Sequence, residues 1–239
     1  MKIIVANRQI VRPGDTLAII ESGEVVKTPR HLPDKHIYIV GNRILSDVNG
    51  LVNIVDDDIQ VIPLEGKYIP RVDDVVIGMV TSVGITNWII DINSPYPGIL
   101  NANDVIENFN PITMNLRDYL DIGEFIVAKI VLFDRTRDPL LTVKGKGLGK
   151  ITEGTVIEVK PSRIPRIIGK KGSMLNLLTS TTGCNMVVGQ NGLIWIRCSD
   201  EKKLEVLIRA IRRIEARSHI RGLTEEIRMF LEKNLGKGE

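Results

Sequence analysis

Residues 163–178, RIPRIIGKKGSMLNLL, place two lysines between two glycines, directly ahead of apolar residues with helical spacing. Because glycine has no Cβ, Gly169 and Gly172 can adopt positive φ and let the backbone approach another chain closely. A helix starting after this loop would direct its free N–H groups and positive dipole end toward the same place. Lys170 and Lys171 add positive charge there. The stretch therefore predicts a loop that contacts a phosphate backbone, and a plain helix–glycine–helix turn is the alternative.

The elements around this loop follow the order strand, helix, helix, strand, strand, helix. They are predicted over residues 155–161, 165–168, 173–182, 184–190, 193–199 and 201–217. Asn191-Gly192 between the last two strands is a strong hairpin signal, and Asp200 can cap the final helix. This order resembles the KH domain, an RNA-binding module whose first two helices are joined by G-x-x-G. The RNA contacts that the resemblance implies are Arg166, Ile168, Gly169, Lys170, Lys171 and Gly172.

Residues 67–150 show five strand-like runs with a looser excursion after the third, the pattern of an OB-type barrel. They resemble the S-one type of RNA-binding barrel, which presents aromatic side chains for base stacking. Trp88 and Tyr96 are the candidates, and packing of Trp88 in the barrel core is the alternative.

Positive charge is concentrated in the middle of the chain. Residues 129–172 hold eleven basic and four acidic residues, a net charge of +7, whereas residues 73–128 hold one basic and eight acidic residues. Such a segment is expected where phosphates dock. The barrel cations that we expect to contact RNA are Arg135, Arg137, Lys144 and Lys146. The glycine spacing in GKGLGK, residues 145–150, does not match that of known phosphate-binding loops. This segment is therefore predicted to be a flexible basic linker.

Residues 1–66 read as short β-branched strands between turns, which predicts a small β domain. Asp56, Asp57 and Asp58 could be imagined as ligands of a nuclease metal site. Consecutive carboxylates in an extended segment point to opposite faces, however, so a turn is the better interpretation.

The remaining composition predicts a cytoplasmic protein without cofactor or metal. The 239 residues are 43% apolar and 26% charged, with neither an apolar run of membrane-spanning length nor a signal peptide. The three histidines accompany no nucleophile or ligand set, so no enzymatic activity is expected. Cys184 and Cys198 are predicted to be reduced, and a single disulfide between them is the alternative.

The predicted fold is therefore a multidomain α+β chain. It has an N-terminal β domain (1–66), a five-stranded OB-type barrel (67–150), a βααββα KH domain (151–221) and a C-terminal helix and tail (222–239). This order resembles the RNA-binding cap subunits of the archaeal exosome, the ribosomal-RNA-processing-protein-four family. The resemblance rests on EGKYIPRVDDVVIGMV, WIIDINSPYPGIL, LTVKGKGLGKI and PSRIPRIIGKKGSML.

The resemblance implies a non-catalytic role. Three copies would sit on a hexameric ring of phosphorolytic subunits, docked through residues 1–66, and capture single-stranded, adenine-rich RNA for 3′-to-5′ degradation and processing. One alternative is a transcription or translation factor, a class in which an S-one barrel is followed by two KH units. The other alternative is a self-sufficient phosphorolytic enzyme, although in such enzymes the two modules occur in reverse order behind two catalytic domains.

Overall fold

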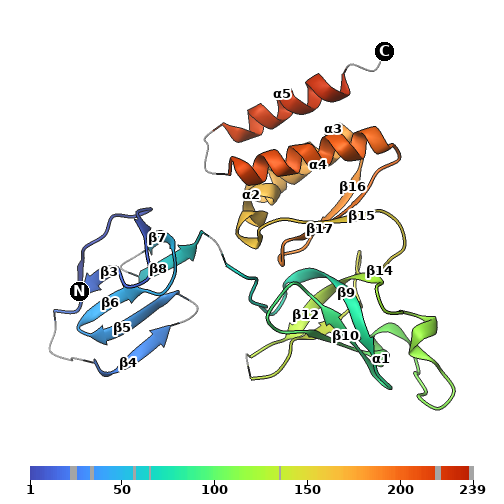
Figure 1. The fold of residues 1–239 in the computed structure, drawn as a ribbon, viewed down its shortest axis with the longest axis horizontal. Coiled ribbons are helices and arrows are strands. Elements are labelled where there is room, and N and C mark those ends of the chain that lie inside the picture. Colours follow the sequence, from blue (N-terminus) through green and yellow to red (C-terminus); the bar gives the residue numbers. More distant parts are fainter. Residues whose placement is uncertain are drawn as a thin grey trace. The chain divides into compact units, whose positions relative to one another are not determined.

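The computed structural model describes residues 1–21, 26–32, 35–55, 58–64, 66–134, 136–218 and 222–236 (Figure 1). Its contacts divide the chain into two units, Met1–Gly66 and Lys67–Glu239. The first is a β unit, and the second joins a β-barrel to an α+β module. The predicted multidomain α+β fold is confirmed.

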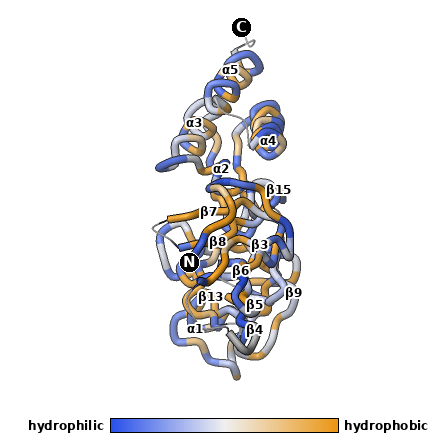
Figure 2. The backbone as a smooth tube through the Cα atoms, turned by 90° about the vertical axis from the view of Figure 1, so that its left-hand side faces the viewer, coloured by the Kyte–Doolittle hydropathy of each residue, from blue (hydrophilic) through white to orange (hydrophobic). Residues whose placement is uncertain are grey.

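The N-terminal unit contains two antiparallel sheets. The five-stranded sheet has the order β1 (Lys2–Ile3), β3 (Thr16–Ile19), β6 (Arg43–Ser46), β5 (Ile37–Gly41), β4 (Val26–Leu32). The three-stranded sheet has the order β2 (Ile10–Val11), β7 (Gly50–Val55), β8 (Asp58–Pro63). Leu17, Val52 and Val61 are among the buried residues between them. Asp56 and Asp57 lie outside the described residues. Figure 2 shows β7 and β8 as largely hydrophobic along their length.

The second unit begins with a closed five-stranded barrel, as predicted. Its strands are β9 (Val75–Val83), β10 (Asn87–Asp91), β11 (Gly98–Asn101), β12 (Phe125–Leu132) and β13 (Leu140–Thr142). β13 closes the barrel because it pairs in parallel with β11 and antiparallel with β12. A short strand, β14 (Gly149–Ile151), extends β12 on its outer edge, and α1 (Ala102–Val105) and η1 (Leu116–Asp118) lie in the excursion after β11.

The start of this unit is fixed by Tyr68. Its buried side chain donates a hydrogen bond from the hydroxyl to Asp74 Oδ2 at 2.6 Å. Burial and this carboxylate together raise the pKa of Tyr68 above its usual range, so the hydroxyl stays a donor. Residues 68–74 are thereby closed into a loop in front of β9.

The C-terminal module has the predicted βααββα order. Its elements are β15 (Thr155–Glu158), η2 (Pro161–Arg163), α2 (Ile164–Ile168), η3 (Lys170–Gly172), α3 (Ser173–Thr182), β16 (Asn185–Val188), β17 (Leu193–Arg197), α4 (Glu201–Ala216) and the additional α5 (Leu223–Leu235). The antiparallel sheet has the order β15-β17-β16 and lies on the side of the module that meets the barrel (Figure 1). Ile194, Leu207 and Ile211 are part of the core between sheet and helices.

The helix boundaries follow from local signals. Asp200 caps α4, since its Oδ1 accepts a hydrogen bond from the Lys202 N–H at 3.0 Å. α5 buries Ile227 and Leu231 in the same core and packs against α3 and α4. None of the helices in the described ranges is long and apolar enough to cross a membrane.

The prediction that the two cysteines are reduced is wrong. Cys184 and Cys198 form a disulfide with a Cα–Cα distance of 4.5 Å. The reason is the hairpin register, in which Asn185 pairs with Arg197. Cys184 directly precedes β16 and Cys198 directly follows β17, so this pairing places the two cysteines opposite each other.

Reduction of this disulfide should therefore destabilise the module. The cysteines are 14 residues apart, and closing a loop of about 15 residues is worth about 3 kcal/mol. We expect dithiothreitol to lower the unfolding free energy of the wild type by roughly this amount in chemical denaturation. The Cys184→Ala/Cys198→Ala variant is the control, because the reductant should not change its stability further. An unchanged wild-type transition after complete reduction would contradict this expectation.

Candidate nucleic-acid interface

The GKKG loop joins α2 to α3 through a sharply bent backbone. Gly169 has φ 74° and ψ 172°, a combination that is essentially restricted to glycine, and Gly172 has φ 78°. A Cβ at Gly169 would lie 2.8 Å from the Met174 backbone nitrogen. The loop therefore requires glycine at its first position for both conformation and space.

The two lysines of this loop are exposed. Neither Lys170 nor Lys171 forms an ion pair with another residue in the part of the chain that the structure describes. Lys171 itself has φ 53°, which presents its side chain from a tight left-handed turn. No side chain caps the ten-residue helix α3, and the N–H of its first residue, Ser173, donates to the Lys170 carbonyl. The positive end of the helix dipole lies beside these lysines and favours an anion there.

The other predicted residues of this module lie on α2. Arg166 is exposed, and Ile168 is half-buried against the core that fully buries Ile167. The structure thus brings a cation, an apolar side chain and the lysine loop together within one turn of helix and the loop that follows.

In the barrel, the stacking role predicted for Trp88 is wrong. Its side chain is completely buried, and its indole Nε1–H donates to the Leu120 carbonyl oxygen at 2.8 Å. The ring fills the barrel core, which is the alternative that the sequence left open. No base can therefore stack on it in the folded protein.

Tyr96 lies in the loop between β10 and β11 and is half-buried. Its ring packs edge-to-face against Phe133, with 5.0 Å between the centroids. The sequence reasoning missed Phe133, although an aromatic residue directly before the basic stretch DRTRD was a usable signal. The two rings form an aromatic pair at the edge of the loop that carries the barrel cations.

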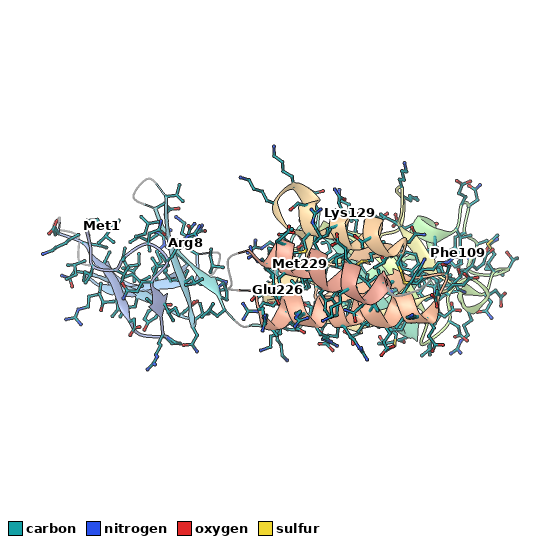
Figure 3. All side chains as sticks on the ribbon, turned by 90° about the horizontal axis from the view of Figure 1, so that it is seen from above. Met1, Arg8, Phe109, Lys129, Glu226 and Met229 are labelled. Atoms are coloured by element: carbon teal, nitrogen blue, oxygen red, sulfur yellow. A yellow bond between two sulfur atoms is a disulfide. The ribbon has the colours of Figure 1, made fainter. Side chains whose placement is uncertain are left out.

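Most of the barrel cations in the described ranges form ion pairs within the barrel. Arg137 pairs with Asp134, Lys144 with Asp104 and Lys150 with Glu124, at N–O distances of 3.2, 3.9 and 2.7 Å. Lys129 on β12, which is labelled in Figure 3, pairs with Asp73 at 2.6 Å. Lys146 is exposed and forms no ion pair with the described residues, and Arg135 lies outside them.

Two of the carboxylates in these pairs, Asp134 and Glu124, have pKa values held below their usual range. Hydrogen bonds from Thr136 and the nearby Arg137 lower the pKa of Asp134. The hydrogen bond from Lys150 is the largest of the effects that lower the pKa of Glu124. Because their cations are paired with carboxylates, Arg137, Lys144 and Lys150 attract phosphates less strongly than unpaired cations would. The GKKG loop is the least compensated cluster among the predicted sites.

Two family models match the chain within the second unit. A model described as "RRP4, S1 domain" matches residues 67–132, and a KH domain model matches residues 154–202. The exosome complex component Rrp4 of Thermosphaera aggregans is 63% identical over 239 residues, covering 100% of this chain and 96% of the relative. The chain belongs to the Rrp4 family of exosome components.

Other comparisons agree. The Rrp4 component of Saccharolobus solfataricus is 42% identical over 238 residues, covering 99% of this chain and 92% of the relative. A crystal structure of a protein provisionally named as an exosome complex RNA-binding protein shares 42% identity, with a TM-score of 0.68. It covers 73% of this chain and 100% of the solved one. The Rrp4 family resemblance that the sequence motifs indicated is therefore confirmed.

The two glycines of the loop offer a matched pair of substitutions. Gly172→Ala should lower the unfolding free energy by about 1–2 kcal/mol, because φ is positive but the nearest atom to a Cβ would be 3.9 Å away. Gly169→Ala should lower it by about 1–3 kcal/mol more, since the added methyl group overlaps the first turn of α3. Chemical denaturation of both variants measures the difference. Equal losses of unfolding free energy in the two variants would show that the loop accommodates the methyl group at position 169 without additional strain.

Proposed function

We propose that this chain is a non-catalytic, RNA-binding component of a cytoplasmic exosome. It captures single-stranded RNA and passes it to separate phosphorolytic subunits for 3′-to-5′ degradation and processing. The observation that carries the proposal is the uncompensated GKKG loop at a helix N-terminus, inside a complete KH fold, in a chain 63% identical to an Rrp4 component. The relatives are named as components of the exosome, which favours this function over a transcription or translation factor.

In this proposal each segment has a task. Residues 67–150 and 151–221 bind RNA, residues 1–66 dock on the ring, and residues 222–239 add a helix that supports the KH fold. The backbone at Gly169 and Gly172 approaches the sugar–phosphate chain, while Lys170 and Lys171 contact phosphates. The barrel contributes Lys146, Arg137 and the half-buried Tyr96–Phe133 pair, and a base can stack on an exposed ring face of that pair. A preference for adenine-rich RNA comes from the family resemblance alone.

Charge reversal tests the RNA-binding proposal. Lys170→Glu/Lys171→Glu should weaken binding of an adenine-rich 20-nucleotide RNA more than Arg137→Glu/Lys146→Glu, because Arg137 is already paired with Asp134. Loss of two phosphate contacts should also reduce the slope of log K against log salt by about 1.4. Fluorescence anisotropy at several salt concentrations measures both quantities.

Arg228→Glu/Lys233→Glu on α5 is the matched control, since it changes the net charge by the same amount on an exposed helix face. It should leave the affinity within about twofold after allowance for long-range charge. If this control weakened binding as much as the loop variant, net charge rather than the GKKG site would explain the binding.

The docking surface that we propose is an apolar row on the three-stranded N-terminal sheet. The register places Ile10, Leu51 and Ile62 opposite one another, on the face turned away from buried Val52 and Val61. Ile10 and Ile62 are 66% and 51% exposed, and Val55, which is 55% exposed, lies farther along the same face beyond Asn53 and Gln60. A contiguous exposed apolar row on a sheet is typical of a surface that another protein covers. We propose that a ring subunit covers it, with three copies of the chain on each hexameric ring.

Ile10→Asp/Ile62→Asp should therefore prevent co-purification with the phosphorolytic ring, because each carboxylate would be buried unpaired. Binding of free RNA by the second unit should remain. Val40→Asp is the control, since Val40 is an exposed apolar residue of the other N-terminal sheet. Unimpaired assembly of the double variant, measured by size-exclusion chromatography, would exclude this row as the docking surface.

A further inference from the structure

Two carboxylates on the barrel are anchored independently of the cations with which they pair. Asp134 Oδ1 accepts hydrogen bonds from the Thr136 N–H and hydroxyl, at 3.0 and 2.7 Å, whereas its Oδ2 pairs with Arg137 at 3.2 Å. The hydrogen bonds from Thr136 also lower the pKa of Asp134. The carboxylate of Asp134 therefore keeps its place, and its charge at neutral pH, when Arg137 moves away.

Asp104 on α1 is anchored in the same way. Its Oδ1 accepts a hydrogen bond from the Thr142 hydroxyl at 2.9 Å, and Lys144 Nζ lies 3.9 Å from the same oxygen. The Asp104 side chain is 25% exposed, whereas that of Lys144 is 63% exposed. In each of the two pairs a threonine holds the carboxylate, and the cation is the partner that can move.

The two cations extend from segments that flank β13. Arg137 lies in the loop before this strand, and Lys144 lies in the segment between it and β14. Exposed ion pairs contribute little to stability, so a phosphate can replace the carboxylate as the partner of either cation. A phosphate oxygen accepts the same charge-assisted hydrogen bonds as a carboxylate oxygen does. Exchange of one anion for the other is therefore easy in both directions.

Lys150 differs from these two cations because two acceptors hold it. Its Nζ pairs with Glu124 at 2.7 Å and also donates a hydrogen bond to the Tyr119 carbonyl oxygen at 3.3 Å. These contacts attach β14 to the excursion that follows β11. The Lys150–Glu124 pair therefore has a structural role, and only the pairs of Asp134 and Asp104 with their cations are suited to exchange with a phosphate.

The exchangeable pairs belong to the candidate RNA-binding surface of the barrel, the barrel face, which comprises Arg137, Lys144, Lys146 and the Tyr96–Phe133 pair. We infer that Asp104 and Asp134 are positioning residues that limit how long the barrel face holds RNA. Each carboxylate yields its cation to a phosphate of the strand and recovers the cation when that phosphate leaves. This inference rests on the proposed function.

Such exchange suits a strand that has to move. RNA that is passed on to other subunits must break its contacts with the barrel each time it advances. The anchored carboxylates remain beside the cations and repel the phosphates, which speeds the release of the strand. The lysines of the GKKG loop form no ion pair with the described residues, so no carboxylate there competes with RNA in the same way.

The test removes the two negative charges and measures RNA release from the full chain. In Asp104→Asn/Asp134→Asn, each side chain keeps an oxygen that can accept the threonine hydrogen bonds but no longer pairs with its cation. We expect this variant to bind an adenine-rich 20-nucleotide RNA about three- to tenfold more tightly than the wild type, mainly through slower dissociation. Stopped-flow fluorescence measures both rate constants, at about 0.15 M salt, where charges are screened beyond about 8 Å.

Glu205→Gln/Glu225→Gln is the matched control. It releases Arg209 on α4 and Arg228 on α5 from their ion pairs and changes the net charge by the same amount. Charges outside a contact act mainly on the association rate, so the dissociation rate of the control should stay within about twofold of wild type.

Unchanged or faster dissociation from the Asn variant would overturn the inference while leaving RNA binding by the chain intact. Equally slowed dissociation from the control would also overturn it, since net charge would then explain the effect. If the wild type bound no RNA at all, the proposed function itself would fail.

Should the double Asn variant not fold, a double-mutant cycle with single substitutions decides the same question. Asp134→Asn should slow dissociation in the wild type, and most of this effect should disappear in Arg137→Gln, because Asp134 then has no arginine at position 137 to release. An effect of equal size in both backgrounds would overturn the inference, since Asp134 would then act independently of Arg137.

Discussion

The buried carboxamide of Asn191 is the interaction on which the arrangement of the second unit depends. Its three hydrogen bonds to Ile77 and Ile92 are made only when the hairpin turn is seated in one position on the barrel. A buried polar group left unsatisfied costs about 1–3 kcal/mol, so other orientations of the KH module are disfavoured. Apolar packing alone is non-directional and would not distinguish between them as sharply. The amide therefore supplies the specificity of the contact between the modules.

The two candidate RNA-binding sites of the second unit differ in the side chains that they present. The barrel presents cations that are largely paired with carboxylates, beside an aromatic pair, whereas the GKKG loop presents unpaired lysines at a helix N-terminus. Exposed ion pairs are weak, typically about 0–1 kcal/mol, so phosphates can compete for the barrel cations. The paired barrel cations therefore attract phosphates less strongly than the unpaired lysines of the loop do. The loop is thus suited to hold the phosphate chain and the barrel to add stacking.

Sequence reasoning predicted the features that local chemistry determines. The glycines and lysines of the loop, the Asn191-Gly192 hairpin and the Asp200 cap each depend on neighbours in the chain, and all three elements form as expected. The burial of Trp88, the pairing of Lys144 with Asp104 and the disulfide depend on which strands become neighbours in the fold. The role of Asn191 was hidden for a related reason, since a residue that favours a turn here also bonds to a segment more than a hundred residues earlier in the chain.

We propose that one RNA strand contacts the GKKG loop and the barrel face together. The most direct measurement is photocrosslinking of a 20-nucleotide RNA that carries 4-thiouridine at single positions, followed by mass spectrometry of the crosslinked peptides. We expect 4-thiouridine at some positions of the RNA to crosslink to the peptide around residues 169–173. At other positions of the same RNA it should crosslink to peptides within residues 133–146. Crosslinks confined to one of these modules, or concentrated in residues 1–66, would contradict it.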